Sequence, residues 1–336
     1  MLLDSGLMIY TVTLNPTLDR TLTVDRFCVG GTFKATHSDL LPAGKGINVA
    51  RVVRTLAMPV VALGFVGRDD APAFDAVLGQ VGAENRLIPV PGATRSSVTI
   101  LDPVQRTETH LREAGCTPPD RAVARLASEL ERVTAGDWVV LAGSLPPGMP
   151  VDTYARWIHL VHKRGARSIL DTNGLALLAG VEAGPTVLKP NLFELWQIDR
   201  GRVHGMEEHD VGQVPMTDVL AAVRRLCARG VSTVVVSLGK RGVLGMDPSG
   251  QAWHVQTTLD RRVVDAVGSG DALAGGLVVG LAQGASFPDV LRLGVACGAA
   301  NTLVAGAGRC ERADVDRLLD RARARAWGAG DVWTAP

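Results

Sequence analysis

Runs of consecutive apolar residues recur along this chain, and helix-like stretches separate them. Six such runs predict strands, at residues 9–14, 60–66, 138–142, 168–171, 186–188 and 233–237. Most of them are apolar throughout, which is typical of strands that are covered on both faces in a parallel sheet. The stretches between them predict helices, among them residues 46–56, 151–164, 216–228 and 272–281. This repeated order of strand and helix indicates an α/β fold, a doubly wound layer sandwich.

Two segments depart from this order, residues 17–41 and 94–113. Both alternate apolar with polar residues, and the alternation predicts antiparallel strands outside the main layer. We interpret them as a small β-sheet flap over the edge of the main sheet, where it would exclude water from a reaction. A hairpin without a functional role is the alternative, and the charged motifs beside both segments favour the flap.

The composition is that of a globular protein, with 46% hydrophobic and 21% charged residues among 336. This length suits one large α/β domain or two smaller ones. The net charge is +1, and we assign the short basic run at residues 321–325 to an exposed C-terminal helix. We therefore expect neither nucleic acid nor a membrane surface as a partner.

The cysteines and the N-terminus bear on the compartment. The chain has five cysteines without CxxC spacing, which favours free thiols over disulfides or a metal site. No apolar run reaches the length of a membrane span, and residues 1–7 lack the features of a signal peptide. We expect a cytoplasmic protein.

The segment from Asp265 to Asp271 carries the most chemistry. Gly268, Ser269 and Gly270 precede a helix-like stretch, and a glycine turn that opens a helix presents unpaired amides to a phosphate. A carboxylate beside a phosphate would repel it, so its presence needs a reason. The simplest reason is that it accepts the proton of a hydroxyl that attacks the phosphoryl group. The motif therefore suggests a kinase with Asp271 as the base, although a turn capped by aspartate explains the segment by itself equally well.

Other polar turns follow predicted strands, at residues 15–19, 42–48, 94–95, 143–148, 171–174, 189–194 and 237–242. Because ligands bind at the carboxyl edge of a doubly wound sheet, these turns predict one shared site. Taken singly, each is compatible with an Asx turn, a tight loop or the exit of a strand before proline. The motifs GxxxxGK[ST] and GxGxxG are absent, which disfavours a P-loop enzyme and a dinucleotide oxidoreductase.

Five of these motifs occur in a characteristic order: residues 15–19, 44–50, 143–148, 189–194 and 265–271. Together they resemble the ribokinase/PfkB carbohydrate-kinase superfamily, and within it the branch of 1-phosphofructokinase, tagatose-6-phosphate kinase and the minor 6-phosphofructokinase. The resemblance implies a ribokinase-like three-layer αβα sandwich with a small β-sheet lid, made by the two flap segments. It also implies a single kinase domain over residues 8–325, with residues 1–7 and 326–336 as terminal extensions.

The resemblance implies phosphorylation of a sugar phosphate with ATP and Mg²⁺. Asp271 would be the catalytic base, and the amides of Gly268, Ser269 and Gly270 would form the anion hole. The residues implied in substrate binding are Asp19, Gly44, Lys45, Asn48, Arg95 and Ser144. Those implied in ATP binding are Lys189, Asn191, Ser237, Gly239 and Gly242, with Glu194 holding Mg²⁺ through water. A homodimer through the lid is implied as well.

The substrate stays open at this point. 1-Phosphofructokinase, which makes fructose 1,6-bisphosphate, is the first expectation, with tagatose-6-phosphate kinase and 6-phosphofructokinase as alternatives. Ser97 stands where the branch usually has asparagine, and Lys45 where the minor 6-phosphofructokinase tends to have glycine. Two other classes of function compete. A sugar or nucleotide sensor on the same fold would have no need of Asp271, and the basic residues near the sugar end weigh against a ribose or nucleoside kinase.

Overall fold

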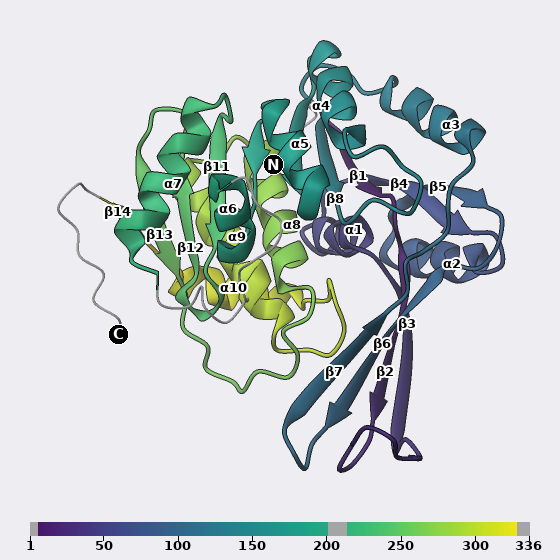
Figure 1. Ribbon diagram of the computed structural model, residues 1–336. Coiled ribbons are helices and arrows are strands. Elements are labelled where there is room, and N and C mark those ends of the chain that lie inside the picture. The colour runs from purple at the N-terminus through teal and green to yellow at the C-terminus, as the bar shows by residue number, and fades with distance from the viewer. Residues whose placement is uncertain (1–5, 201–213, 328–336) are drawn as a thin grey trace.

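A ten-stranded sheet forms the centre of the molecule in the computed structural model, which describes residues 6–200 and 214–327 (Figure 1). The strands lie in the order β14-β13-β12-β11-β10-β9-β8-β1-β4-β5. Neighbours from β11 to β5 in this order pair in parallel, whereas β12, β13 and β14 are antiparallel. Their bounds are β1 Ile9–Thr13, β4 Val60–Gly67, β5 Glu84–Val90, β8 Trp138–Ala142, β9 Arg167–Asp171, β10 Val187–Leu188, β11 Thr233–Ser237, β12 Val243–Met246, β13 Ala252–Gln256 and β14 Arg323–Trp327.

The direction in which strands are added reverses at β1. The chain places β4 and β5 on one side of β1, and then β8 to β11 on the other. Every residue of β1, β4 and β8 is buried, as the continuous apolar runs predicted. The carboxyl ends of β1 and β8 therefore flank a topological switch point, where sheets of this kind bind ligands.

Helices cover both faces of the main sheet and complete a three-layer sandwich. One hydrophobic core contains side chains of α3, α4, α5, α6 and α7, and the other contains side chains of α1, α2, α8, α9 and α10. The bounds are α1 Lys45–Thr55, α2 Ala71–Val81, α3 Asp120–Leu130, α4 Thr153–Lys163, α5 Gly174–Glu182, α6 Leu192–Arg200, α7 Met216–Ala228, α8 Ser269–Ala282, α9 Phe287–Asn301 and α10 Arg312–Arg321. The predicted α/β layer sandwich is confirmed.

Helix α8 has no polar face, because it lies between α1 and α9. Two glycines allow this close packing. A Cβ at Gly275 would lie 2.7 Å from Val52 Cβ, and a Cβ at Gly276 would lie 2.7 Å from Gly294 Cα. The buried helix holds its first turn firmly against α1 and so positions Asp271.

A second sheet of four strands projects from the sandwich (Figure 1). Its order is β3-β2-β6-β7, with bounds β2 Thr17–Thr23, β3 His37–Ala43, β6 Arg95–Asp102 and β7 Thr107–Arg112. Both predicted flap segments thus form strands outside the main layer. The expectation of antiparallel strands was wrong for the central pair, since β2 and β6 are parallel. They come from distant segments that leave the main sheet in the same direction, and only the hairpin-like pairs β2–β3 and β6–β7 are antiparallel.

The C-terminal part differs from its prediction. Arg321 ends α10, but Arg323 and Arg325 lie on β14, so the basic run does not form one exposed helix. Strand β14 pairs with β13 up to Trp327, which lies beyond the expected domain end at residue 325. Residues 1–5 and 328–336, the greater part of the expected terminal extensions, lie outside the described residues.

The five cysteines, all of them among the described residues, are free thiols. Among the helices of residues 6–200 and 214–327, none combines the length and the apolar character that a membrane span requires.

Candidate active site

The predicted site residues converge at the carboxyl ends of the parallel strands. Lys189 follows β10, Lys45 begins α1, and Asp271 lies in the first turn of α8. Asp171, which was not predicted as a site residue, ends β9 and lies among them. Side-chain contacts connect these elements, although the residues are far apart in the sequence. The four-stranded sheet joins the sandwich beside them, because β2 begins shortly after β1 and β3 leads into α1.

Two lysines share one buried carboxylate at the centre of this edge. Lys45 Nζ lies 2.9 Å from Asp171 Oδ1, and Lys189 Nζ lies 3.1 Å from Asp171 Oδ2. Burial by itself would raise the pKa of Asp171, but the two ammonium groups outweigh it and lower that pKa. The carboxylates of Asp171, Glu194 and Asp271 likewise raise the pKa of Lys45 against the effect of burial. The cluster thus holds two ammonium groups, which suit phosphate groups, among three carboxylates.

Asp271 is buried on the other side of this cluster. Its Oδ2 accepts a hydrogen bond of 2.8 Å from Asn48 Nδ2. Burial and the charge of Asp171 raise the pKa of Asp271 to about 6, although Lys45, Asn48 and Lys189 act to lower it. A carboxyl group with such a pKa is ionised near neutral pH and still accepts a proton readily, as a general base must.

The glycine turn before Asp271 has a geometry that only glycine supports. Gly268 is the N-cap of α8, with φ of 81°, and a Cβ there would lie 2.6 Å from Ala307 Cα. The first amides of a helix have no acceptor within it, which leaves the amide of Gly270 for an anion. The Ser269 amide already donates to the Ala266 carbonyl at 3.3 Å.

Lys189 connects this turn with the lysine–aspartate cluster. A Cβ built on Gly270 would lie 3.6 Å from Lys189 Nζ, so the ammonium group borders the first turn of α8. Similarly, a Cβ at Gly143 would lie 3.7 Å from Lys45 Cβ. Motifs from four separate parts of the sequence therefore lie around one volume.

Asn191 and Glu194 form a reciprocal capping box at the start of α6. The Asn191 amide donates to Glu194 Oε2 at 2.8 Å, and the Glu194 amide donates to Asn191 Oδ1 at 2.8 Å. Burial raises the pKa of Glu194, and Lys45 and Lys189 counteract it. Within the described residues, no group of three or more histidine, cysteine, aspartate or glutamate side chains forms a candidate metal site.

The turn after β11 lies next to this capping box. Ser237 pairs with Asn191 in an isolated bridge, and its amide donates to the Pro190 carbonyl at 2.9 Å. Gly242 has φ of 80°, and a Cβ there would lie 2.0 Å from the Val255 carbonyl oxygen. Gly239, with φ of 61°, has open space around it. Gly242 thus shapes the backbone of the turn, whereas Gly239 leaves room for a ligand.

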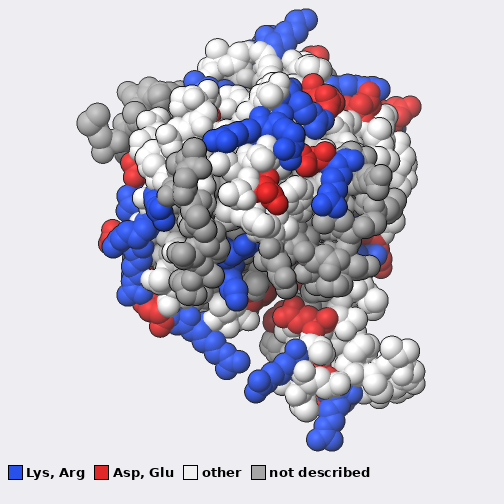
Figure 2. Space-filling view, turned by 60° about the vertical axis from the view of Figure 1, so that its left-hand side comes forward, with Lys and Arg blue, Asp and Glu red and all other residues white. Residues whose placement is uncertain are grey.

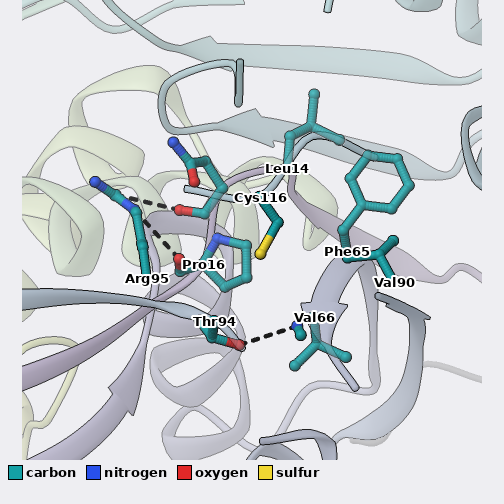
Figure 3. A pocket seen from close by; sticks show the side chains of 10 residues that line it. Leu14, Pro16, Phe65, Val66, Val90, Thr94, Arg95 and Cys116 are labelled. Atoms are coloured by element: carbon teal, nitrogen blue, oxygen red, sulfur yellow. Dashed lines mark hydrogen bonds between the residues drawn. The ribbon is translucent and has the colours of Figure 1, made fainter. Parts of the chain in front are cut away.

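Arg95 lies at the start of β6, where the four-stranded sheet joins the main sheet. Its guanidinium donates to the main-chain carbonyls of Asn15 at 3.2 Å, Pro16 at 3.3 Å and Glu113 at 3.2 Å. It therefore ties the start of β6 to the segment between β1 and β2. Figure 3 shows Arg95 with its bonds to Asn15 and Pro16 at one side of a pocket whose other walls include Leu14, Phe65 and Cys116.

The remaining predicted substrate residues surround this junction. Asn15 Nδ2 donates to Ser144 Oγ at 3.3 Å, which brings Ser144 to the same place. Burial raises the pKa of Asp19 on β2, and Arg95 is among the charges that oppose this effect. Gly44 is the N-cap of α1, and a Cβ there would lie 2.6 Å from Thr13 Cγ2.

Two residues of the site were not among the predicted ones, Asp171 and Arg51. Asp171 was recognised as part of a turn at a strand end, but nothing in the sequence showed that both lysines meet it. Arg51 lies in α1, one turn after Asn48, and is buried. A single charged residue on the apolar face of a helix was the available signal.

Charges of both signs are mixed on the molecular surface. On the face in Figure 2, basic and acidic side chains lie next to one another over much of the area that the view shows. This distribution agrees with the net charge of +1.

Comparisons with known proteins show what the whole chain is similar to. Residues 12–314 match the pfkB family of carbohydrate kinases. The chain is 32% identical over 293 residues to a 1-phosphofructokinase of Bacillus subtilis, which is 87% of this chain and 92% of that protein. It is 32% identical over 315 residues to a 1-phosphofructokinase of Escherichia coli K12, with coverages of 93% and 96%. Among solved structures, phosphofructokinase-2 from Escherichia coli in complex with substrates and products superposes with a TM-score of 0.84 at 28% identity, over 94% of this chain and 99% of that one.

Proposed function

The chain belongs to the pfkB family of carbohydrate kinases, and we propose that it transfers the γ-phosphoryl group of ATP to fructose 1-phosphate. The product is fructose 1,6-bisphosphate. The observation that carries this proposal is the buried Asp271 in the first turn of α8, with a pKa of about 6, beside the two lysines that share Asp171. The names of the relatives in Bacillus subtilis and Escherichia coli support the choice of substrate.

Asp271 acts as the general base. It accepts the proton of the attacking sugar hydroxyl through one carboxylate oxygen, while Asn48 holds the other oxygen at 2.8 Å. Phosphoryl transfer requires little covalent chemistry from the protein, so the alignment of this carboxylate with the hydroxyl provides much of the effect. A sensor without catalysis would have no use for a carboxylate kept near its ionisation point.

The transferring phosphoryl group carries negative charge, and this charge is met by the turn and the lysines. We assign this role to the amides of Gly268 and Gly270 and to the dipole of α8, with Ser269 contributing less because its amide is already bonded. Lys189 borders the turn, and Lys45 lies beside the Gly143 turn. Removing water from this volume strengthens each of these interactions.

The nucleotide is held along β10, β11 and α6 in this proposal. Lys189 and Asn191 meet its phosphates, and the turn from Ser237 to Gly242 contacts the remainder. Glu194 fits Mg²⁺ as one carboxylate ligand acting through water, because Mg²⁺ keeps several waters and binds through few protein groups. When bound, the ion supplies neutralisation of phosphate charge.

The sugar phosphate lies at the junction with the four-stranded sheet. We assign its contacts to Asp19, Gly44, Lys45, Asn48, Arg95 and Ser144. The carboxylate of Asp19 accepts from sugar hydroxyls, and Arg95 positions the junction and faces the substrate phosphate with its remaining N–H groups. The same sheet serves as a lid and as the interface of a homodimer, for which Leu40 and Leu111 provide exposed apolar surface. Light scattering tests the dimer, and the proposed compartment is the cytoplasm.

Fructose 6-phosphate and tagatose 6-phosphate remain second candidates. Fructose 6-phosphate is the ligand in a solved structure of Escherichia coli phosphofructokinase-2 that superposes on this chain with a TM-score of 0.82, which supports it as a candidate. The test is ADP release by the purified protein with fructose 1-phosphate, fructose 6-phosphate, tagatose 6-phosphate, ribose and adenosine. We expect the highest kcat/KM with fructose 1-phosphate. A higher value with another sugar phosphate would change the substrate, and no ADP with any sugar phosphate would refute the proposal.

A further inference from the structure

Arg51 is a buried cation that the proposed reaction does not use directly. Its guanidinium donates to the Pro42 carbonyl at 2.6 Å, the Ala307 carbonyl at 3.0 Å and Asn48 Oδ1 at 3.3 Å. No ion pair of Arg51 occurs within residues 6–200 and 214–327. Burying a charge without a carboxylate in contact is costly, so a specific task is needed to explain this residue.

The task of Arg51 follows from the chemistry of its guanidinium and of the Asn48 amide. A guanidinium has only donors, so the oxygen of the Asn48 amide must face Arg51. The NH₂ group of Asn48 then faces the other way and donates to Asp271 Oδ2 at 2.8 Å. With the amide reversed, its oxygen would face the carboxylate, and that arrangement requires a protonated Asp271. Arg51 therefore selects the orientation that favours an ionised base.

We propose that Arg51 is a positioning residue, which holds the Asn48 amide so that it donates to Asp271 and keeps this base ionised. The inference rests on the proposed role of Asp271. Arg51 itself touches neither Asp271 nor the reacting volume in any contact of the structure, and its effect passes through Asn48.

The hydrogen bond from Arg51 to the Ala307 carbonyl supports the same site through the glycine turn. Ala307, whose carbonyl accepts from Arg51, lies under the glycine turn, since a Cβ at Gly268 would be 2.6 Å from Ala307 Cα. A Cβ at Gly308 would be 2.5 Å from Asn48 Cα. One guanidinium thus joins α1, the end of β3 and the segment on which the turn rests.

The charges that surround both groups give the expected direction of the effect. Burial and Asp171 raise the pKa of Asp271, and Lys45, Lys189 and the Asn48 hydrogen bond lower it. Burial lowers the pKa of Arg51 to about 10, with Arg309 acting in the same sense and Asp19 against it, so the guanidinium stays charged at neutral pH. Without the hydrogen bond from Asn48, the effects of burial and Asp171 should raise the pKa of Asp271 further.

Arg51→Met tests the proposal, and Arg54→Met is the matched control. Arg54 lies on the same helix and also donates to main-chain carbonyls, those of Val81 at 3.2 Å and Met58 at 2.9 Å, but it has no contact with Asn48. For Arg51→Met we expect kcat to fall about 10- to 100-fold, KM for ATP to change by less than about threefold, and the acid limb of kcat/KM to move upward by about one pH unit. Arg54→Met should leave the acid limb in place.

Two further variants separate positioning from folding. Arg51→Lys retains the charge and one donor, so it should recover part of kcat and of the acid limb. In an Asn48→Ala background, Arg51→Met should shift the limb no further, because the path through Asn48 is already removed. An unchanged acid limb in Arg51→Met, or an equal shift in the Asn48→Ala background, would overturn the proposal.

A titration that requires no turnover distinguishes this inference from the proposed function. The ¹³C carboxyl signal of Asp271, identified by its loss in Asp271→Asn, should titrate at higher pH in Arg51→Met than in the wild type. If the wild type released no ADP with any sugar phosphate, the proposed function would fail and this titration would still decide the role of Arg51. Equal titration midpoints in the two proteins would reject it.

Discussion

The catalytic edge of the main sheet and the neighbouring four-stranded sheet hold their polar residues in different ways. At the catalytic edge, Asp171, Lys189 and Asp271 are buried, and each has a charged or hydrogen-bonding partner. In the four-stranded sheet, by contrast, most residues of β7 and the first half of β3 are exposed. Packing fixes the side chains at the catalytic edge in one arrangement. The positions of the exposed side chains on the four-stranded sheet depend on the ligand or protein that covers them. We infer that the chemistry is set at the first region and substrate choice at the second.

The largest effect should come from the buried base. Asp271→Asn is expected to lower kcat about 10²- to 10⁴-fold while the Kd for ATP stays within about threefold, because the variant loses proton acceptance and keeps the shape of the site. ADP release and calorimetric ATP binding measure the two quantities. Asp120→Asn, at an exposed aspartate in the first turn of α3, is the control and should behave like the wild type. Wild-type turnover by Asp271→Asn would show that Asp271 is not the general base.

A smaller effect should follow from changing the turn that carries the base. Gly268→Ala combines a left-handed φ of 81° with a Cβ 2.6 Å from Ala307 Cα, so the turn must shift. We expect kcat/KM to fall about 10- to 100-fold, with a loss of about 1 to 3 kcal/mol in the free energy of unfolding. Gly250→Ala has a similar φ of 84° and open space, so it isolates the cost of the backbone conformation. Equal activity losses in both variants would contradict a specific role of the Gly268 turn.

The raised pKa of Asp271 also predicts a dependence of stability on pH. A carboxyl whose pKa is about 6 in the folded protein, above its unfolded value, stabilises the fold below the unfolded pKa, and this contribution is lost as the pH rises through 6. At pH 8 the free energy of unfolding of Asp271→Asn should therefore exceed that of the wild type by about 1 to 3 kcal/mol. This difference should shrink below about pH 4. Denaturant titrations at both pH values measure it. A difference independent of pH would show that burial does not strain this carboxylate.

The smallest effect should come from the junction with the four-stranded sheet. Arg95→Met removes three bonds to main-chain carbonyls and a cation near the proposed sugar phosphate. We expect KM for the sugar phosphate to rise about tenfold while KM for ATP and kcat change by less than about threefold. Arg106→Met, at an exposed arginine between β6 and β7, is the control and should keep the wild-type KM. A fall in kcat with KM unchanged would place Arg95 with the catalytic edge and undo the division between the two regions.

Local patterns predicted much of the fold. The apolar runs at β1, β4, β8 and β11 and the helix at residues 216–228 lie where they were expected. The parallel pairing of β2 with β6 could not be read in the same way, because it joins segments far apart in the chain. Likewise, the basic residues Arg323 and Arg325 favour a surface helix locally, but pairing with β13 makes them part of a strand.

The site shows the same limit more strongly. The motifs named Asp271, Lys45 and Lys189 as candidates, because glycine turns and strand ends have local signatures. They did not show that Asp171 joins both lysines or that Arg51 reaches Asn48. Nor did they show that Arg95 donates hydrogen bonds to three main-chain carbonyls.

The sequence by itself determined the alternation of strands and helices, the glycine turn and the residues that a phosphoryl transfer needs. Only the tertiary structure decided which of these groups meet. Lys45 and Asp171 are 126 residues apart, and Asn48 and Asp271 are 223 residues apart, yet both pairs are in contact. The pKa of a carboxyl depends on its burial and on the charges within a few ångströms, and both are properties of the folded chain. For this reason the pKa of Asp271 is raised to about 6, while the pKa of Asp171, which is also buried, is lowered by the two lysines beside it.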